Sequence, residues 1–218
     1  HGKYPGDVKA DGNDLVIDGR RIKVTAERDP ANLPHAENGV ELVLECTGFF
    51  TKRSDAQKHI DAGAKKVLIS APGKEVDLTV VYGVNHDKLT ADHKIVSNAS
   101  CTTNCLIPIL TVLDEALGIE HGVTTTIHSA MNDQPVIDAY HRTDLRLTRS
   151  AMQSIVPVDT GLAGGISRLM PSLAGRFECL HVRVPTINVS AMDAALTVRR
   201  DTSAAQVNEA VEAAQDAG

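Results

Sequence analysis

Four short apolar runs, each the length of one strand, constrain the fold more than any other feature of this chain. They are VELVLECTG (40–48), KKVLIS (65–70), LTVVYGV (78–84) and HKIVSN (93–98). Strands that are apolar on both faces and alternate with helices are typical of a parallel sheet in an α/β domain. One such helix is SDAQKHIDAG, with an expected N-cap at Ser54. Its composition indicates an exposed helix. The sequence predicts an α/β domain over residues 1–100.

Two other stretches predict antiparallel structure. LVIDGRRIKVTAERDP (15–30) contains two short strands joined by Asp-Gly, a strong hairpin signal. Farther along, HGVTTTIHSA (121–130) is rich in β-branched residues, and RFECLHVRVPTINVSAMDAALTVRR (176–200) alternates as strands do. We therefore expect an α+β second domain over residues 101–218, with an antiparallel sheet and helices on one side.

The motif SNASCTTNC (97–105) places two cysteines four residues apart, directly before the apolar run LIPILTVLDEAL. A helix that begins near Cys101 would present unpaired N–H groups and about half a positive charge there. Such a position lowers a thiol pKa from about 8.5 to roughly 3.5–7.5, which makes the thiolate available as a nucleophile. Cys101 is the predicted nucleophile, and Cys105, one turn farther, is interpreted as a packed core thiol.

The two cysteines have three other interpretations: a zinc site, a disulfide and ordinary packing. A zinc site needs further ligands at recognisable spacing, whereas the remaining cysteines, Cys46 and Cys179, are isolated. A disulfide across one helical turn would be strained. On this motif alone, the interpretation that both are buried structural cysteines also remains possible. The sequence predicts no metal site and reduced thiols in a cytoplasmic protein.

A nucleophilic thiol needs a base, and His128 is the candidate because it closes the predicted strand GVTTTIH. His59, in the helix described above, and the histidines of polar loops are interpreted as solvated. The hypothesis assigns His128 two functions, as a base and as a hydrogen-bond donor to an oxyanion.

Arginines and hydroxyl groups in the second half could hold an anion. Arg183 lies in an apolar strand, so it should meet a carboxylate or a phosphate. PVDTG supplies Thr160 and Gly161, a hydroxyl and a backbone N–H. DLRLTR supplies Arg146 and Arg149, which would bind an anion or form surface salt bridges.

Composition excludes several classes of partner. The chain has 218 residues, 42% of them hydrophobic, and a net charge of −6. This charge argues against nucleic acid and anionic membrane surfaces, which attract an excess of Lys and Arg. No apolar run approaches the length of a membrane span, and no leader sequence opens the chain.

SNASCTTNC followed by TTIHS resembles the signature of the phosphorylating glyceraldehyde-3-phosphate dehydrogenase superfamily. The likeness continues through ERDP, ECTG, AGAKKVLISAPG, GVN and RVPTINVS. It implies an incomplete Rossmann-type first domain, NAD as cofactor, a sugar phosphate substrate and a homotetramer with an S-shaped interface loop at 131–155. Cys101 would be the nucleophile and His128 its partner, 128 − 101 = 27 residues away. The resemblance also implies cofactor-binding residues (Arg28, Thr47, Gly48, Ser70, Asn132) and anion-binding residues (Ser100, Thr102, Arg149, Thr160, Gly161, Arg183).

Two departures bear on the substrate. Met131 occupies the position of a phosphate-binding threonine, and Gly164 that of a lysine. HSAMNDQPVIDAYH and VVYGVN are closer to the erythrose-4-phosphate dehydrogenase branch, on the route to pyridoxal phosphate. We therefore expect NAD-dependent oxidation of erythrose 4-phosphate to 4-phosphoerythronate, with water releasing the thioester. The alternative is the phosphorylating glycolytic enzyme.

Rivals from other classes are a cysteine hydrolase or acyltransferase that needs no cofactor, and a non-catalytic interaction module. The resemblance also implies a fragment, because the family's glycine-rich NAD fingerprint would precede His1 and its last segment would follow residue 218. Such a fragment is expected to be inactive alone.

Overall fold

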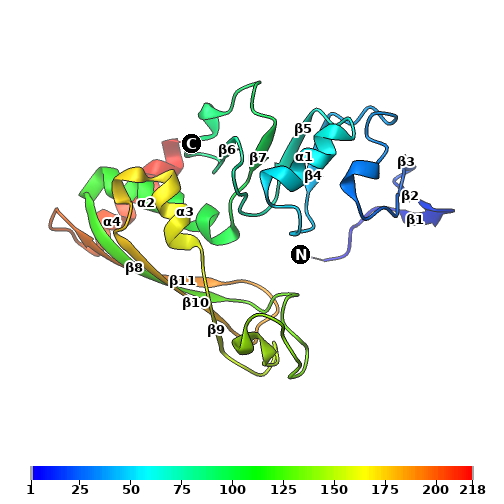
Figure 1. The fold of residues 1–218 in the computed structure, drawn as a ribbon. Coiled ribbons are helices and arrows are strands. Elements are labelled where there is room, and N and C mark those ends of the chain that lie inside the picture. Colours follow the sequence, from blue (N-terminus) through cyan, green and yellow to red (C-terminus); the bar gives the residue numbers. More distant parts are fainter. Residues whose placement is uncertain (1, 218) are drawn as a thin grey trace. The chain divides into compact units, whose positions relative to one another are not determined.

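A computed structural model describes residues 2–217 of the chain, which divide into two compact units (Figure 1). The first unit holds residues up to 77 together with 91–96, and the second holds 78–90 together with the residues from 97 onward. The described residues form three sheets, and each unit has its own buried apolar cluster.

The first unit opens with the predicted hairpin. Strands β1 (Val8–Asp11), β2 (Asp14–Ile17) and β3 (Arg20–Ile22) form an antiparallel sheet in that order. Asp18 and Gly19, which join β2 to β3, have φ angles of 48° and 79°. Two positive φ angles are what a two-residue type I′ turn requires, so the hairpin prediction is confirmed.

The parallel sheet of the first unit follows, after a short 3-10 helix η1 (Pro30–Asn32). Strand β4 (Leu42–Glu45) pairs in parallel with β5 (Lys66–Ile69), and helix α1 (Arg53–Asp61) connects them. Strand β7 (Ile95–Ser97) lies on the other side of β5, and β6 (Leu78–Thr79) follows it, so the strand order is β4-β5-β7-β6. The residues buried between α1 and the sheet are Ala56, Val67, Ile69 and Ile95. The α/β prediction for this part of the chain is confirmed.

Two details of α1 differ from the sequence-based interpretation. Its N-cap is Lys52, without a capping side chain, and not Ser54. His59 is buried with 4% exposure, and not solvated. Its Nε2 lies 3.2 Å from the carboxylate of buried Glu45, and its Nδ1 lies 3.1 Å from His35 Nε2. A buried carboxylate needs hydrogen-bond partners, and these contacts turn the polar His59 inward.

The second unit contains a mixed sheet and most of the helices. Its elements are β6 (Leu78–Thr79), η2 (His86–Lys88), α2 (Cys101–Leu117), β8 (Ile119–His128), η3 (Leu145–Thr148), β9 (Val156–Val158), α3 (Leu162–Leu169), η4 (Pro171–Leu173), β10 (Phe177–Arg183), β11 (Ala191–Val198) and α4 (Ala204–Ala217). No helix within residues 2–217 is long and apolar enough to cross a membrane.

The strand order of the mixed sheet is β11-β8-β10-β9. Strands β8 and β11 are antiparallel, as are β10 and β9, but β8 and β10 are parallel. The predicted antiparallel sheet thus contains one parallel pair, β8 with β10. The chain between β8 and β10 is a long crossover that includes α3, and such a crossover allows parallel pairing.

Helices α2 and α3 pack against one face of this sheet. The apolar residues of α2 recur at helical spacing on one side and join the start of β8 and the side chains of α3 in the core. The buried members are Leu106, Ile107, Leu110, Leu113, Ile119, Leu162, Ile166, Met170, Leu173 and Phe177. The opposite sheet face exposes apolar side chains, with Val123 at 52% and Leu180 at 51%. The α+β expectation is confirmed.

Candidate functional site

The turn between β7 and α2 places Cys101 as the first residue of the helix. Ala99 has a positive φ of 58°, and the Ser100 side chain caps the helix by accepting the Thr103 N–H at 3.1 Å. Within residues 2–217, the N–H groups of Cys101 and Thr102 have no hydrogen-bond partner. The predicted helix start is confirmed, and unpaired donors lie beside the thiol.

His128 ends strand β8 at the same place in the second unit. Its Nε2 lies 3.6 Å from the Sγ of Cys101, within contact range for sulfur, and the residue is 9% exposed. The two residues that the sequence paired across 27 positions are therefore in direct contact. A thiol and an imidazole at this distance can exchange a proton.

The other ring nitrogen, Nδ1, has two neighbours. The Arg183 Nη1 lies 2.8 Å away, and the Ser129 carbonyl oxygen lies 2.7 Å away. Arg183 can only donate, so when it donates to Nδ1 the ring proton sits on Nε2 and faces the sulfur. When Nδ1–H donates to Ser129 instead, Nε2 is free to accept a proton. The contacts of Nδ1 thus allow His128 to act as either a donor or a base.

Arg183 lies opposite His128 in the parallel β10–β8 register, with 8% exposure. Its Nη2 is 3.9 Å from the Asp133 carboxylate. Burial lowers the pKa of the guanidinium, while Asp133 and Cys101 oppose that shift. The expected carboxylate partner is present, although at the far limit of an ion pair.

His181 was missed by the sequence reasoning. It precedes Arg183 by two residues in β10, so both side chains share one face of the strand. Its ring stacks on that of His128, with centroids 5.0 Å apart and planes inclined by 27°. Burial, reinforced by the positive charges of Arg183 and His128, lowers the pKa of His181 to about 4. The alternation of His181 and Arg183 was the available signal.

A cavity of about 160 Å³ opens beside the thiol. Its lining residues are Cys101, Thr102, Cys105, Thr126, His128, Ser190, Ala191 and Met192. Cys105 is exposed here, which corrects its interpretation as a packed core thiol. It faces the cavity because the apolar face of α2 is formed by other residues, beginning with Leu106 and Ile107. The buried hydroxyl of Thr126 has no partner within residues 2–217.

The other expected anion-binding residues lie outside the cavity lining in the described structure. Gly161 is the N-cap of α3, and the Thr160 hydroxyl accepts a backbone N–H of that helix at 3.2 Å. Arg149 pairs with Asp138 at 2.9 Å, and Arg146 pairs with two aspartates. These two arginines form the surface salt bridges that were the alternative to anion binding.

The two departures from the family pattern lie in open surroundings. Met131 is 44% exposed. Gly164 has no atom within 4 Å of the position that a Cβ would occupy. Asn132, an expected cofactor-binding residue, is also exposed.

The remaining expected cofactor residues lie in the first unit. Thr47 and Gly48 follow β4, and Ser70 follows β5, at the carboxyl ends of two parallel strands, where open α/β sheets bind ligands. Buried Glu45 fixes this loop by accepting the Thr47 N–H at 2.7 Å and its hydroxyl at 2.5 Å. No atom lies within 4 Å of a Cβ placed on Gly48, so a ligand could approach the backbone there. Arg28, the other expected cofactor-binding residue of this unit, is exposed and lies shortly before η1.

Two family models match separate parts of the chain. Residues 1–53 match the family model "Glyceraldehyde 3-phosphate dehydrogenase, NAD binding domain", which indicates NAD as the cofactor. Residues 100–218 match "Glyceraldehyde 3-phosphate dehydrogenase, C-terminal domain".

Two curated relatives are both named glyceraldehyde-3-phosphate dehydrogenase. The protein from Zymomonas mobilis is 55% identical over 219 residues, covering 100% of this chain and 65% of the relative. The protein from Pseudomonas aeruginosa is 55% identical over 216 residues, covering 99% of this chain and 64% of the relative. The chain thus spans slightly less than two thirds of their length. It belongs to the glyceraldehyde 3-phosphate dehydrogenase family.

Proposed function

We propose that the complete protein oxidises the aldehyde of a sugar phosphate with NAD, through a covalent intermediate on Cys101. The observation that carries this proposal is the 3.6 Å contact between Cys101 Sγ and His128 Nε2 at the N-terminus of α2. Unpaired N–H groups there stabilise a thiolate. A reactive thiolate beside an imidazole is the requirement for covalent attack on a carbonyl.

The chemistry follows from these positions. The Cys101 sulfur forms a bond to the aldehyde carbon, and the carbonyl oxygen becomes the oxyanion of a hemithioacetal. The Cys101 N–H and the His128 Nε2–H are the donors available to that oxyanion, and one such donor contributes about 10²–10³ in rate. A bound nicotinamide would supply the acceptor for the hydride of the hemithioacetal carbon. The thiol proton passes to His128 Nε2, 3.6 Å away, and from there to the oxyanion, which becomes a hydroxyl. As the hydride leaves, His128 Nε2 takes the hydroxyl proton back, in the tautomer that donates Nδ1–H to the Ser129 oxygen at 2.7 Å.

The substrate proposal rests on the relatives and on two residues. Both relatives are named glyceraldehyde-3-phosphate dehydrogenase, which favours the three-carbon aldehyde, with phosphate releasing the thioester. This is the alternative of the sequence analysis and now the better supported one. Erythrose 4-phosphate stays as a second candidate, because exposed Met131 supplies no hydroxyl and Gly164 supplies no cation for a substrate phosphate.

The test compares the two aldehydes on the complete protein. NADH formation is followed with glyceraldehyde 3-phosphate and with erythrose 4-phosphate, each with and without inorganic phosphate. Phosphate-dependent turnover with higher kcat/KM for the three-carbon aldehyde would support the proposal. A higher kcat/KM for the four-carbon aldehyde without phosphate would replace it with the second candidate. Met131→Thr should then raise kcat/KM for the three-carbon aldehyde alone.

The same assay tests the rival chemistry. Cys101→Ala should abolish NADH formation with either aldehyde, since no other thiol contacts His128 among the described residues. A cysteine hydrolase would instead turn over a thioester or an activated ester without NAD. Turnover that persists in the absence of NAD would overturn the dehydrogenase proposal.

We also propose that the complete protein assembles with copies of itself, as the family resemblance implies for a tetramer. Support comes from exposed apolar side chains in the 131–155 loop: Val136 78%, Ile137 74%, Tyr140 84%, Leu145 79% and Ile155 70%. Surfaces this apolar are typical of interfaces. Light scattering after gel filtration should give four times the chain mass, and Ile137→Asp should lower it. A monomer for the unsubstituted protein would refute this proposal.

A further inference from the structure

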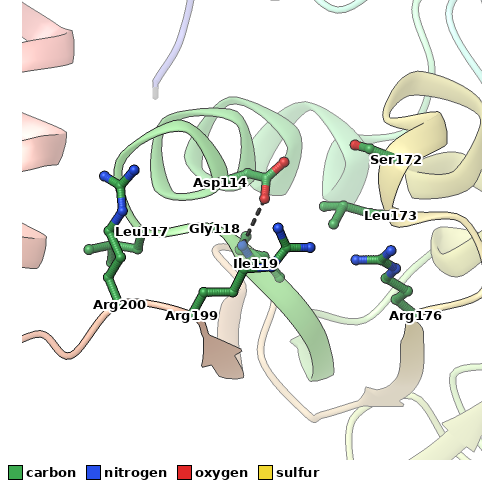
Figure 2. A pocket seen from close by; sticks show the side chains of 9 residues that line it. All are labelled: Asp114, Leu117, Gly118, Ile119, Ser172, Leu173, Arg176, Arg199 and Arg200. Carbon is green, nitrogen blue, oxygen red and sulfur yellow. Dashed lines mark hydrogen bonds between the residues drawn. The ribbon is translucent and has the colours of Figure 1, made fainter.

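A second cavity, of about 370 Å³, lies at the far end of α2 from Cys101 (Figure 2). It is formed where α2 ends and β8 begins, with η4 on one side and the end of β11 on the other. The lining residues are Asp114, Leu117, Gly118, Ile119, Ser172, Leu173, Arg176, Arg199 and Arg200. None of them lines the cavity beside the thiol.

Three guanidinium groups and one carboxylate line this second cavity. Arg200 donates to the Ala116 carbonyl at 2.7 Å. Within residues 2–217, the side chains of Arg176 and Arg199 have no hydrogen-bond or ion-pair partner. Figure 2 shows their guanidinium groups extending toward the same space from different sides, below Asp114. Two guanidinium groups without an ion-pair partner among the described residues therefore line one concave site.

Backbone hydrogen bonds fix the main chain at both arginines, whose side chains are exposed. The Arg199 N–H donates to the Gly118 carbonyl at 2.8 Å, and the Arg176 N–H donates to the Leu173 carbonyl at 3.1 Å. Gly118, with a φ of +71°, leaves room for the Arg199 stem, whose Cδ lies 3.3 Å from the position of a Cβ. Because the stem rests on Gly118, less conformational entropy is lost when a ligand binds.

Asp114 is the only carboxylate among the described lining residues, and one of its two oxygens is already hydrogen-bonded. Asp114 Oδ1 accepts the Ile119 N–H at 2.7 Å, as the dashed line in Figure 2 marks. The second oxygen, Oδ2, is left to accept a hydroxyl proton. The Ser172 hydroxyl also lines the cavity and can donate to an anion.

We propose that this cavity binds a small hydroxylated phosphate monoester. Arg176 and Arg199 would grip the phosphate dianion, since planar guanidinium forks match phosphate oxygens and form charge-assisted hydrogen bonds. Asp114 would accept a hydroxyl of the ligand. A carboxylate beside two cations also discriminates against ligands that carry charge but no hydroxyl.

The site is separate from the proposed chemistry. Asp114, the first lining residue of the cavity along α2, is 114 − 101 = 13 residues from Cys101, or about 20 Å at about 1.5 Å a residue. Loss of dehydrogenase activity would leave this proposal standing, and loss of binding here would leave the dehydrogenase proposal standing.

The test is a titration of the chain with glycerol 3-phosphate at pH 7.5, followed by amide NMR. Saturable shifts are expected at Gly118, Ile119 and Leu173. The double variant Arg176→Gln/Arg199→Gln should weaken the Kd at least about tenfold, because two charge-assisted contacts are lost. Its matched control is Arg20→Gln/Arg142→Gln, which removes the same charge from exposed positions and should leave the Kd unchanged. The dispersion of each spectrum reports whether the variant is folded.

Two further arms identify what is recognised. Inorganic phosphate should bind more weakly than glycerol 3-phosphate, and Asp114→Asn should reduce that difference. Arg199→Lys, which keeps the charge and loses the fork, should bind with intermediate affinity. An equal rise in the Kd for glycerol 3-phosphate in both double variants would overturn the proposed site. Equal amide shifts with sodium chloride at the same ionic strength would overturn it as well. Equal affinity for the two phosphates would overturn the assignment of Asp114.

Discussion

The imidazole of His181 stacks on that of His128 at a centroid distance of 5.0 Å, on the face of the sheet that also carries Arg183. Three groups able to carry positive charge thus share one buried region. Burial, with 7% exposure, and then the fixed charge of Arg183 lower the pKa of His181, so its ring is neutral at neutral pH. A neutral ring beside His128 supplies a polarisable face to the imidazolium that forms when His128 accepts a proton.

The first prediction concerns acid stability. The pKa of His181 falls from 6.5 to about 4 in the folded chain, chiefly through burial. As the pH drops from 6.5 toward 4, the unfolded chain binds this proton first, so stability is present above pH 6.5 and lost below it. The loss is of order 3 kcal/mol. His181→Phe keeps the stacked ring without the titration.

Urea unfolding at pH 7.5 and pH 4.5 measures this effect. The free energy of unfolding should fall more steeply with pH in the unsubstituted chain than in His181→Phe. If the free energy of unfolding depends on pH identically in the two proteins, His181 is not the cause of the loss of stability in acid.

The second prediction concerns thiol reactivity. Arg183→Lys loses the Nη1 contact to His128 Nδ1 at 2.8 Å, because a lysine cannot place its donor in the same plane. The Nε2–H tautomer that supports the Cys101 thiolate is then less favoured. Iodoacetamide should label Cys101 roughly tenfold more slowly at neutral pH.

Exposed Cys105 is the internal reference for this experiment, since mass spectrometry reads both cysteines in one peptide. Arg168→Lys, at an exposed position of α3, is the matched control. Slower labelling of both cysteines would show a general loss of structure instead of a loss at His128.

The third prediction concerns packing in β8. A Cβ on Gly122 would lie 2.6 Å from the Phe177 ring and 2.7 Å from Leu196. Gly122→Ala should therefore destabilise the second unit by about 1–3 kcal/mol through overpacking. Gly164→Ala is the contrasting variant, because its Cβ meets open space in a helix and should be neutral or stabilising. Thermal unfolding of the two variants measures this effect. A Gly122→Ala variant with the same unfolding midpoint as the unsubstituted chain would contradict the close packing around Gly122.

The fourth prediction concerns the first unit. Burial opposes ionisation of Asp77, but the N–H groups of Ile95 and Lys94 and the Arg53 guanidinium lower its pKa from 3.8 to about 2. This stability is present above pH 3.8 and is lost as the pH falls through about 2. Asp77→Asn should cost about 2 kcal/mol at pH 7.

Hydrogen exchange of the Val67 amide, in the core of the same unit, reports this loss. Exposed Asp92 provides the control variant Asp92→Asn, which should leave the exchange rate unchanged. The difference in Val67 exchange rate between the two variants should be smaller at pH 2.5 than at pH 7. A difference that does not change with pH would show that the ionisation of Asp77 is not its cause.

The sequence anticipated features that local signals determine. The Asp18–Gly19 turn, the start of α2 at Cys101 and the position of His128 at a strand end all depend on residues next to them in the chain. The pairing of Cys101 with His128 came from a motif of known meaning, and the structure brings their atoms to 3.6 Å.

Features that depend on tertiary neighbours were not anticipated. His59 is polar and lies on a short helix, so only the buried Glu45 behind it explains its burial. Cys105 precedes an apolar run, yet the rotation of α2 turns it toward a cavity. His181 stands in an alternating strand, and its relevance arises from β10 pairing in parallel with β8. No periodicity specifies which strand is its neighbour.

Helix α2 and strand β8 are consecutive, with Gly118 alone between them, and they carry Cys101 and His128 at their outer ends. Cys101 and His128 thus lie at the two ends of one helix–turn–strand unit, and both its helix and its strand contribute residues to the core. One inserted residue in the helix would swing the thiol about 100° around the axis. One inserted residue in the strand would put the imidazole on the opposite face of the sheet. An insertion or deletion within the helix or the strand would therefore separate the thiol from the imidazole, whereas substitutions keep the 27-residue interval between them.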